Sequence, residues 1–465
     1  MKHTDFNEIE EKFNKISNFY NSKKTKDILF RKNQLKSLLK TIQNHKEDIY
    51  AALKKDLNKS SREAFLTEYL LVVEEINHMT NHLSSYAKTK KKFPGMTQVP
   101  GILEIRKESF GKVLIISPWN YPFQLAMVPL IGAIAAGNTV ILKPSEFSQS
   151  TSDVLELILK EALYEGLCEV VFGEAEEAEY LLNLNFDKIF FTGNPRVGKI
   201  VMENAAKNLI PVTLELGGKS PAIIHASADI KDAAKKIAFG KTMNSGQTCV
   251  APDFVLVPKY LKEEFISEIL RVFDESFPTE KYFRRYYPWM NKETRFNRMI
   301  ELLEGLEVLT NKDSIFFRDT LQIFPCVVDE PSWEYRIMQE EIFGPLLPVL
   351  TYESEDELFK LFKNKEKPLA LYVFSEDKKF VENTVQEIDS GGVCVNDTLL
   401  HISSSKAPFG GVGNSGMGEY HGKYSFDTFS RERTVLKKFK FFDFGFRYHP
   451  FKESFMYEVL RRIYK

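Results

Sequence analysis

Continuous runs of apolar residues alternate with stretches of helical periodicity in the middle of the chain. Four such pairs follow one another: strand-like runs at 113–116, 140–142, 170–172 and 189–191 precede helical stretches at 123–136, 152–163, 175–183 and 196–207. A strand without polar alternation is buried on both faces, which is typical of a parallel sheet covered by helices. The pattern therefore predicts a doubly wound α/β unit of the type that binds nucleotides.

A second alternating series begins near residue 221 and predicts a second α/β domain. Its strand-like runs lie at 221–224, 253–257, 369–374 and 393–396, with helical stretches between them. Residues 278–320 give no clear pattern. No internal repeat or low-complexity linker separates the two series, so we expect the two domains to pack closely.

The first hundred residues have the polar, amphipathic texture of helices. Residues 5–60 predict two helices and residues 62–88 predict a third, and we interpret Lys88 and 90–92 as its solvated end. His78 and His82 lie one turn apart in the third helix, but no third ligand lies beside them. We interpret this pair as part of a solvated helix face and predict no metal site.

Length and composition narrow the functional classes. A chain of 465 residues exceeds one ordinary core, in agreement with two or three domains. The net charge of −1 favours neither nucleic acid nor an anionic membrane as a partner. The longest apolar run, 125–137, is shorter than the roughly 20 residues of a membrane span. The four cysteines form no C-x-x-C pair and the N-terminus lacks a signal-peptide pattern, so we expect a reducing, cytoplasmic location.

Residues 244–253 concentrate the candidate chemistry. Cys249 follows a predicted helix that runs from Asp229 to about Asn244, and it precedes the strand-like run at 254–257. Its small polar neighbours let backbone amides approach the sulfur. Because the thiolate is the nucleophile, such a site must lower or locally overcome a reference pKa of about 8.5. Taken alone, the stretch also fits a cysteine that is simply a small core residue.

Several polar residues follow predicted strands, where the ligands of an open parallel sheet gather. Asn120 lies in the Pro-bounded turn after the first strand, and its amide can donate to an oxyanion. Lys143 and Glu146 follow the second strand and can face ribose hydroxyls. Glu215 precedes a pair of glycines at the proposed domain junction, where it is a candidate general base.

Two glycine motifs resemble phosphate-binding loops without completing them. Residues 193–199 match most of a P-loop, but Ile200 occupies the position of the Mg²⁺-binding Ser or Thr. That turn can still hold a phosphate at a helix N-terminus. Gly411, Gly413 and Gly416 spell G-x-G-x-x-G but follow no predicted strand, so we interpret them as a chance match.

These pieces, in this order, resemble the aldehyde dehydrogenase superfamily over about residues 10 to 435. The matching segments are 118–122, 143–146, 191–193, 215–219, 244–253, 340–345 and 408–416. The run 418–426 is most similar to the class 3 branch, which acts on fatty or aromatic aldehydes. Two departures from the family pattern are the stretch 288–290, where a Gly- or Arg-containing sequence is expected, and Asn194, which replaces the more usual Ser.

The resemblance implies a Rossmann-like cofactor domain, a catalytic domain and a small β bridging arm. The expected ranges are 1–97 and 109–216 for the NAD(P)-binding domain, 217–408 for the catalytic domain, 98–108 and 425–441 for the arm, and 442–465 for a C-terminal tail.

The resemblance also implies a mechanism. Cys249 would attack an aldehyde to form a thiohemiacetal, whose oxyanion is held by Asn120 and the Cys249 N–H. Hydride transfer would leave a thioester, and Glu215 would activate the water that hydrolyses it. The implied cofactor residues are Lys143, Glu146, Thr192, Gly193, Gly198, Leu216, Gly217, Glu341 and Phe343. NAD is the expected cofactor because Glu146 would repel a 2′-phosphate, and NADP is expected to be tolerated because Lys143 lies nearby.

Three other functions fit parts of the pattern. A coenzyme-A-acylating dehydrogenase would share the cysteine, but it would not need Glu215 as a base. A non-catalytic relative can lose the nucleophile or the base, and here both are present. A metal-dependent hydrolase is disfavoured by the scattered His and Cys positions.

Two features concern assembly rather than catalysis. The segments 102–105 and 433–436 have strand texture without an evident partner, and in similar proteins such an arm bridges subunits, so we expect a homodimer. The tail interleaves aromatic residues with charges, and 453–465 predicts an amphipathic helix with Phe455, Val459 and Ile463 on one face. Its rings either pack on their own subunit or dock near the substrate entrance.

Overall fold

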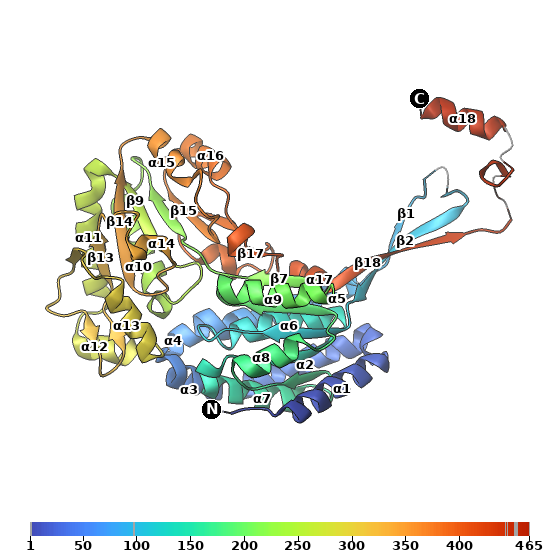
Figure 1. Cartoon of the computed structure of the whole chain (residues 1–465), viewed down its shortest axis with the longest axis horizontal. Helices are drawn as coiled ribbons and strands as arrows, with labels where there is room; N and C mark the ends of the chain where they lie inside the picture. The colour runs from blue at the N-terminus through green and yellow to red at the C-terminus, as the bar shows by residue number, and fades with distance from the viewer. Residues whose placement is uncertain (1, 96–97, 442, 444, 451–453, 465) are drawn as a thin grey trace.

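Two sheets of buried parallel strands organise the computed structural model, which describes residues 2–95, 98–441, 443, 445–450 and 454–464 (Figure 1). The first sheet has the order β17-β7-β6-β3-β4-β5. Its strands are β17 (Gly416–Met417), β7 (Val212–Glu215), β6 (Lys188–Thr192), β3 (Lys112–Ile116), β4 (Thr139–Lys143) and β5 (Cys168–Val170). Only β17 runs antiparallel to its neighbour. The helices between these strands are α6 (Gln124–Ala136), α7 (Gln149–Ala162), α8 (Ala175–Leu182) and α9 (Pro195–Lys207).

The second sheet has the order β10-β13-β14-β9-β8-β15-β16, and only the edge strand β10 is antiparallel. These strands are β10 (Val308–Leu309), β13 (Cys326–Asp329), β14 (Leu346–Tyr352), β9 (Phe254–Pro258), β8 (Pro221–Ile224), β15 (Ala370–Phe374) and β16 (Gly392–Val395). Its main helices are α10 (Ile230–Thr242), α11 (Lys262–Ser276), α15 (Glu355–Phe362) and α16 (Lys378–Glu387). Two wound α/β sheets therefore confirm the fold class.

The region without a clear sequence pattern forms short elements beside the second sheet. They are α12 (Glu280–Tyr286), α13 (Glu293–Glu301), the hairpin of β11 (Phe316–Phe317) and β12 (Gln322–Ile323), and α14 (Arg336–Gln339).

Helix α6 explains how the first sheet is covered. Every residue from Gln124 to Ala136 is buried, so the helix is apolar on all sides and lies inside the protein, against α5 and the first sheet. It ends at Gly137, whose φ of 94° is the left-handed conformation that glycine adopts without strain. The helix follows β3 directly, so its N-terminal end lies where that strand ends.

The N-terminal region differs from its sequence prediction. Instead of two helices before residue 60, there are three: α1 (Phe6–Asn21), α2 (Ile28–Asn44) and α3 (Lys46–Leu57). The prediction was wrong because a left-handed Lys23 and an N-capping Asp27 interrupt the helical pattern, and His45 then separates α2 from α3. The next helix is continuous from 61 to 86, through α4 (Ser61–Ala64), a π-helical turn η2 (Phe65–Tyr69) and α5 (Leu70–Tyr86).

A three-stranded ribbon extends away from the two sheets (Figure 1). It consists of β1 (Lys90–Lys92), β2 (Gly101–Ser109) and β18 (Ser430–Lys438), in the order β1-β2-β18. The two predicted strand segments pair with each other, with Ile105 opposite Thr434. Lys90 to Lys92 form an edge strand rather than the helix end that was expected, because they pair with β2. Exposed lysines on an edge strand oppose further strand pairing.

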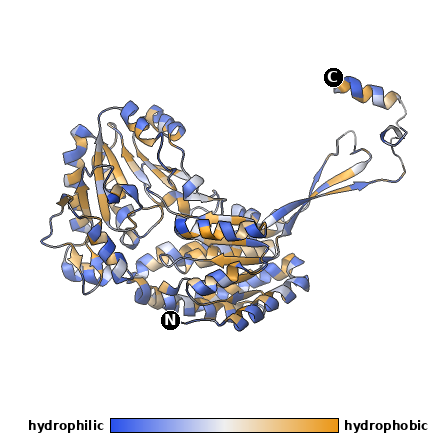
Figure 2. Ribbon diagram, viewed as in Figure 1, coloured by the Kyte–Doolittle hydropathy of each residue, from blue (hydrophilic) through white to orange (hydrophobic). Residues whose placement is uncertain are grey.

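The tail lies beyond the tip of this ribbon (Figure 1). The predicted amphipathic helix is present as α18 (Phe455–Ile463), and Figure 2 shows hydrophobic and hydrophilic residues interleaved along it. None of its residues is buried, and Phe455 is 84% exposed. Packing of α18 on its own subunit is therefore not observed. Within the described part of the chain, no helix has the length and apolar character needed to cross a membrane.

Candidate active site

The carboxyl ends of four neighbouring strands meet at one edge of the first sheet. The strand register places Ile116 of β3 between Lys143 of β4 and Phe191 of β6, and it places Thr192 opposite Glu215 of β7. The predicted residues that follow these strands therefore belong to one site, as expected for an open parallel sheet.

The predicted helix before the nucleophile ends earlier than expected, at Thr242. The next residues leave the helix because Asn244, Ser245 and Gly246 have φ values of 51°, 57° and 70°. A Cβ on Gly246 would lie 2.3 Å from the carbonyl oxygen of Gly344, so only glycine fits this close approach. The turn thus sets Cys249 against the segment 340–345.

Cys249 is partly exposed, and the charges of two carboxylates act on its thiol. Burial, then Glu341 and then Glu215, raise the pKa of its thiol, while hydrogen bonds from the backbone N–H groups of Cys249 and Val250 oppose the rise. These influences favour the thiol over the thiolate. Attack on a carbonyl therefore requires loss of the thiol proton as the bond forms, which is the second of the two routes anticipated from the sequence.

Asn120 lies directly against the nucleophile loop. Its side-chain Nδ2 donates to the carbonyl oxygen of Gln247 at 3.0 Å, and the next residue, Tyr121, shares a 2.6 Å hydrogen bond with Thr248. An amide Nδ2 carries two N–H groups, so one is used for positioning and one is left for an oxyanion. The structure therefore brings Asn120 and Cys249 together.

Glu215 ends β7 and is 2% exposed. Within the described residues, neither carboxylate oxygen has a hydrogen-bond partner. Burial, and secondarily the charge of Glu419, raise the pKa of Glu215 well above its ordinary value. Once ionised, a buried carboxyl group with a raised pKa is a stronger base towards water than an ordinary glutamate.

The glycine motif at 411–416 forms the 3₁₀ turn η8 (Gly413–Ser415), packs on the Glu215 strand and opens no α-helix. Gly416 pairs with Glu215 through β17, and Leu216 N donates to the carbonyl oxygen of Ser415 at 3.1 Å. This confirms that the G-x-G-x-x-G match is fortuitous as a dinucleotide fingerprint.

The segments 215–219, 249–253 and 340–345 are joined by one ion pair. Lys219 pairs with Asp253 and also donates to the backbone of Glu340 at 3.1 Å, while Asp253 accepts from Ile342 N at 2.9 Å. A Cβ on Gly217 would lie 2.3 Å from a carboxylate oxygen of Glu341, so the glycine makes room for that side chain. Burial, then the charge of Asp253, raise the pKa of Glu341 to about 8.

The aromatic residue of this segment faces the Asn120 turn. Phe343 has a left-handed φ of 52°, and its ring meets Trp119 edge to face at 5.7 Å. A non-glycine residue in this conformation is uncommon and is found where a side chain must be aimed.

The remaining predicted cofactor residues lie along the same edge. Lys143 is buried and donates to the carbonyl oxygen of Gly173 at 2.8 Å, and burial lowers its pKa. Glu146 is partly buried in the turn after β4. A Cβ on Gly198 would lie 2.7 Å from Leu216, so α9 approaches β7 closely, and Gly193 precedes the Asn194 cap of α9.

This edge fits a nicotinamide dinucleotide. The buried Thr192 hydroxyl and one carboxylate oxygen of Glu341 lack partners within the described residues. Such buried polar atoms are normally satisfied, so they indicate where a ligand with hydroxyl or amide groups would bind. Asn194 caps α9 by accepting from Val197 N at 3.0 Å, which a Ser at that position could also do.

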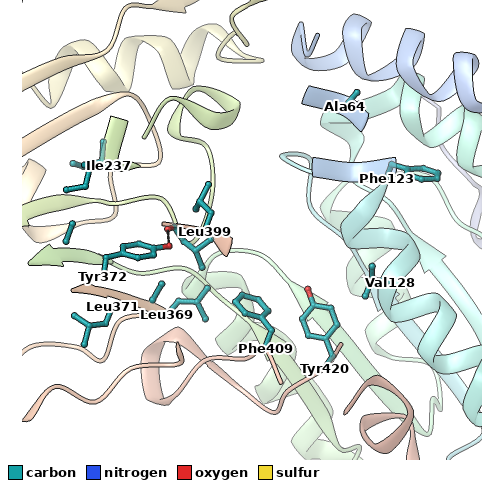
Figure 3. Packing of buried hydrophobic residues seen from close by; sticks show 14 of the residues in the cluster. Ala64, Phe123, Val128, Ile237, Leu369, Leu371, Tyr372, Leu399, Phe409 and Tyr420 are labelled. Atoms are coloured by element: carbon teal, nitrogen blue, oxygen red, sulfur yellow. Dashed lines mark hydrogen bonds between the residues drawn. The ribbon is translucent and has the colours of Figure 1, made fainter. Parts of the chain in front are cut away.

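A cavity opens between α5, α6 and the 3₁₀ turn η7 (Leu400–Ser403). Its lining includes Leu71, Val128 and Ile402, together with the buried polar residues Glu75 and His421. Figure 3 shows Tyr420 between Val128 and Phe409. Burial, then the charges of Glu215 and Cys249, raise the pKa of Tyr420.

The histidine pair of α5 is occupied by protein contacts. The rings of His78 and His82 stack at 4.5 Å, His78 Nε2 bonds Tyr86 at 2.8 Å, and His78 Nδ1 meets Ser405 at 3.2 Å. Over the described ranges, no three His, Cys, Asp or Glu side chains form a metal-binding group.

Several residues that hold the site were not identified from the sequence. Arg298 donates to the backbone oxygens of Glu341 and Ile342 at 2.6 and 2.7 Å, and Trp289 O accepts from Gln247 Nε2 at 3.1 Å. Trp289 lies in the departure at 288–290, so a signal existed there. The buried residues Lys59 and Glu68 gave none, because they belong to stretches that look like ordinary polar helix.

A sequence profile of the aldehyde dehydrogenase family matches residues 4–435. The chain belongs to the aldehyde dehydrogenase family. Among relatives, the 4,4'-diaponeurosporen-aldehyde dehydrogenase of Staphylococcus aureus (strain NCTC 8325 / PS 47) is 43% identical over 97% of this chain and 98% of its own. Aldehyde dehydrogenase family 3 member A2 of Macaca fascicularis is 41% identical over 92% of this chain and 88% of its own.

Two further matches extend this placement. A dog (Canis lupus familiaris) relative described as aldehyde dehydrogenase, dimeric NADP-preferring, is 41% identical over 90% of this chain and 92% of its own. The solved structure of the substrate-bound state of Staphylococcus aureus AldH superposes with a TM-score of 0.94 at 42% identity, covering 98% of this chain and 99% of that one. This aldehyde dehydrogenase is therefore most similar to the class 3 branch, and its activity is the oxidation of aldehydes to carboxylic acids.

Proposed function

We propose that Cys249 is the nucleophile, Asn120 the oxyanion donor and Glu215 the general base of this oxidation. The observation that carries the proposal is their convergence: the Asn120 amide bonds the nucleophile loop, while the unpartnered Glu215 raises the pKa of the same thiol. Glu215 is the base of the later hydrolysis, and the thiol proton leaves through water, because Cys249 is partly exposed.

The steps follow from this arrangement. Sulfur bonds to the aldehyde carbon, and the resulting oxyanion receives the free N–H of Asn120 and the backbone N–H of Cys249; one such donor is worth roughly 3–4 kcal/mol. When bound at the sheet edge, a nicotinamide cofactor would supply the acceptor for the hydride that leaves this carbon. Glu215 then removes a proton from water, which attacks the thioester carbon, and the carboxylic acid leaves as the Cys249 sulfur departs.

We propose that residues 1–97 and 109–216 bind the cofactor and that residues 217–408 supply the nucleophile. Lys143 and Glu146 would hold the adenosine ribose, Thr192, Gly193 and Gly198 would border the phosphates, and Glu341 and Phe343 would orient the nicotinamide end. NAD is preferred because the Glu146 carboxylate repels a 2′-phosphate. NADP is tolerated, an expectation supported by the NADP-preferring description of the dog relative.

The proposed substrates are medium- or long-chain aliphatic or aromatic aldehydes. The apolar side chains of Leu71, Val128 and Ile402 in the cavity support this class, because they offer a surface for a hydrocarbon chain.

The exposed face of α18 is proposed to dock near the substrate entrance of a partner subunit. The ribbon is the proposed dimer arm, and the four free cysteines support a reducing, cytoplasmic location.

A panel of aldehydes assayed by NADH and NADPH absorbance tests this proposal. We expect kcat/KM to rise with chain length from acetaldehyde to decanal, and NAD to exceed NADP. A flat dependence on chain length would contradict the substrate class. Formation of acyl-CoA in place of free acid when coenzyme A is added would identify the acylating alternative instead.

A further inference from the structure

Lys59 has no exposed surface, which is rare for a lysine. Its ammonium group donates to Glu68 at 2.6 Å and to the backbone oxygen of Asn120 at 2.9 Å, and it lies 3.8 Å from the centroid of the Tyr121 ring. A buried ion pair adds little net stability compared with apolar residues of similar volume. A role in positioning explains its presence better than a role in stability.

Glu68 is the second member of this group and is also fully buried. One oxygen accepts from Lys59, and the other accepts from the backbone N–H groups of Phe123 and Gln124 at 2.9 and 3.0 Å. These N–H groups belong to the first turn of α6, where a carboxylate is favoured by the helix dipole. Lys59 and Glu68 therefore hold both ends of the segment 120–124.

Glu63 connects the same helix to the nucleophile loop. Its carboxylate accepts from the backbone N–H of Asn244 at 2.7 Å, and burial raises its pKa to about 7. The Asn244 side chain in turn donates to the Asn120 backbone oxygen at 2.8 Å, the oxygen that Lys59 also binds. The backbone oxygen of Asn120 thus connects the Asn120 turn to the nucleophile loop.

The π turn η2 (Phe65–Tyr69) follows Glu63 and contains Glu68. Leu70 N bonds Phe65 O across this turn, in the wider i to i+5 pattern. The wider turn changes the side of the helix on which Glu68 lies relative to Glu63. Single π turns are frequent at functional sites.

We propose that Lys59, Glu68 and Glu63 form a brace that positions the Asn120 amide against the Cys249 loop. None of the three reaches the reacting atoms; Lys59 and Glu68 act through Asn120, and Glu63 acts through Asn244. The inference rests on the proposed oxyanion role of Asn120. Because a displacement of about 1 Å at a catalytic group can cost roughly 100-fold in rate, a small shift of this segment would be measurable.

A double-mutant cycle tests the brace in the full-length enzyme, with Lys59→Met, Asn120→Ala and the combination. The readout is the pre-steady-state rate of NADH formation with decanal, together with the KM for NAD. Lys59→Met should slow hydride formation about 10- to 100-fold and leave the KM for NAD within about twofold. In the Asn120→Ala background, Lys59→Met should slow hydride formation little further, because Lys59 acts through Asn120.

Lys188→Met is the matched control. Lys188 is also buried, but it begins β6, at the end of the strand opposite to Thr192, and its pKa is lowered to about 8 by burial alone. Lys188→Met should leave the hydride rate within about twofold of wild type, whatever its effect on Tm. If Lys59→Met does not fold, Glu68→Gln, which preserves the volume, replaces it in the same cycle.

The outcomes separate the two ideas. No effect of Asn120→Ala would refute the oxyanion proposal itself. Two results would overturn the brace while Asn120→Ala shows its expected defect. In the first, Lys59→Met or Glu68→Gln multiplies the Asn120→Ala defect independently. In the second, Lys59→Met or Glu68→Gln slows hydride formation no more than Lys188→Met does.

Discussion

Two neighbouring parts of the active site differ in how their buried polar atoms are satisfied. Around the nucleophile loop, the side-chain N–H groups of Asn120, Asn244 and Gln247 all donate to backbone carbonyl oxygens, although the side-chain oxygens of Asn244 and Gln247 have no partner within the described residues. At the adjoining sheet edge, both oxygens of Glu215 and the hydroxyl of Thr192 have no partner within the described ranges.

This difference separates the groups that position the reactants from the groups that are proposed to react. Side-chain amides that donate to backbone oxygens fix where an oxyanion would lie. They cost little folding free energy, because each buried donor has an acceptor. Buried carboxylates without partners are unfavourable for the folded protein, and they are retained where a ligand, water or proton must be bound. Changes to the reacting groups should therefore reduce activity most and stability least.

The largest effect is expected for Cys249→Ala. Removal of the nucleophile should lower aldehyde oxidation by roughly 10⁴-fold or more, the scale observed when other covalent nucleophiles are removed. Because the cofactor edge is unchanged, NAD should still bind, as measured by quenching of protein fluorescence. Cys394→Ala, on β16 of the second sheet, is the control and should retain activity. A Cys249→Ala enzyme with most of its activity would refute the assignment.

The pH dependence should report Glu215. Its pKa is raised, so the carboxyl group is neutral at low pH and becomes a base only as the pH rises. We expect kcat to rise roughly tenfold per pH unit below that pKa. In Glu215→Gln this ascending limb of kcat should be absent; an unchanged limb would assign the titration to another group.

The same group makes a prediction about stability. Since the folded protein holds the Glu215 proton more tightly than the unfolded chain, stability falls as pH rises from the ordinary Glu pKa towards the raised one. Glu215→Gln should thus raise Tm relative to wild type at alkaline pH and leave it unchanged below about pH 4. A Tm difference that is constant with pH would indicate a packing effect only.

A smaller effect is expected at the proposed ribose position. Glu146→Gln should raise the kcat/KM for NADP relative to NAD by about fivefold, the scale of one partly exposed charge interaction. Glu161→Gln, on the surface of α7, is the matched control and should leave the ratio unchanged. An unchanged ratio in Glu146→Gln would remove Glu146 from the ribose site.

The smallest effect is expected for removal of the C-terminal helix α18, whose apolar side chains are exposed. Truncation after Lys438 keeps β18 and removes α18. It should lower kcat/KM for decanal by roughly twofold to threefold and leave acetaldehyde unchanged, because only remote binding is lost. Sedimentation should show an intact dimer. Equal losses for both aldehydes would exclude docking at the substrate entrance.

The sequence predicted those parts of the site that depend on one short segment. The buried strands were predicted from their apolar runs. Asn120, Glu215 and Cys249 could be placed because each follows or ends an element that was predicted from the sequence. The left-handed turn at Asn244 was missed because its neighbours continue a helical pattern, and the contacts that hold it, with Glu63, Asn120 and Gly344, come from distant segments.

Residues that act across the chain gave no such signal. Lys59 and Glu68 contact segments 55 to 61 positions away, and each resembles a solvated helix residue until those segments are brought together. Lys90 to Lys92 form a strand because β2 supplies a partner, which local propensity cannot reveal.

The most direct test of the mechanism is the fate of Glu215→Gln mixed with decanal and NAD. Without the base, the enzyme should release about one equivalent of NADH in a burst and then stall as a thioester. Intact-mass and peptide mass spectrometry should then find a decanoyl group on Cys249. Steady turnover without an adduct, or an acyl group on another residue, would contradict the account.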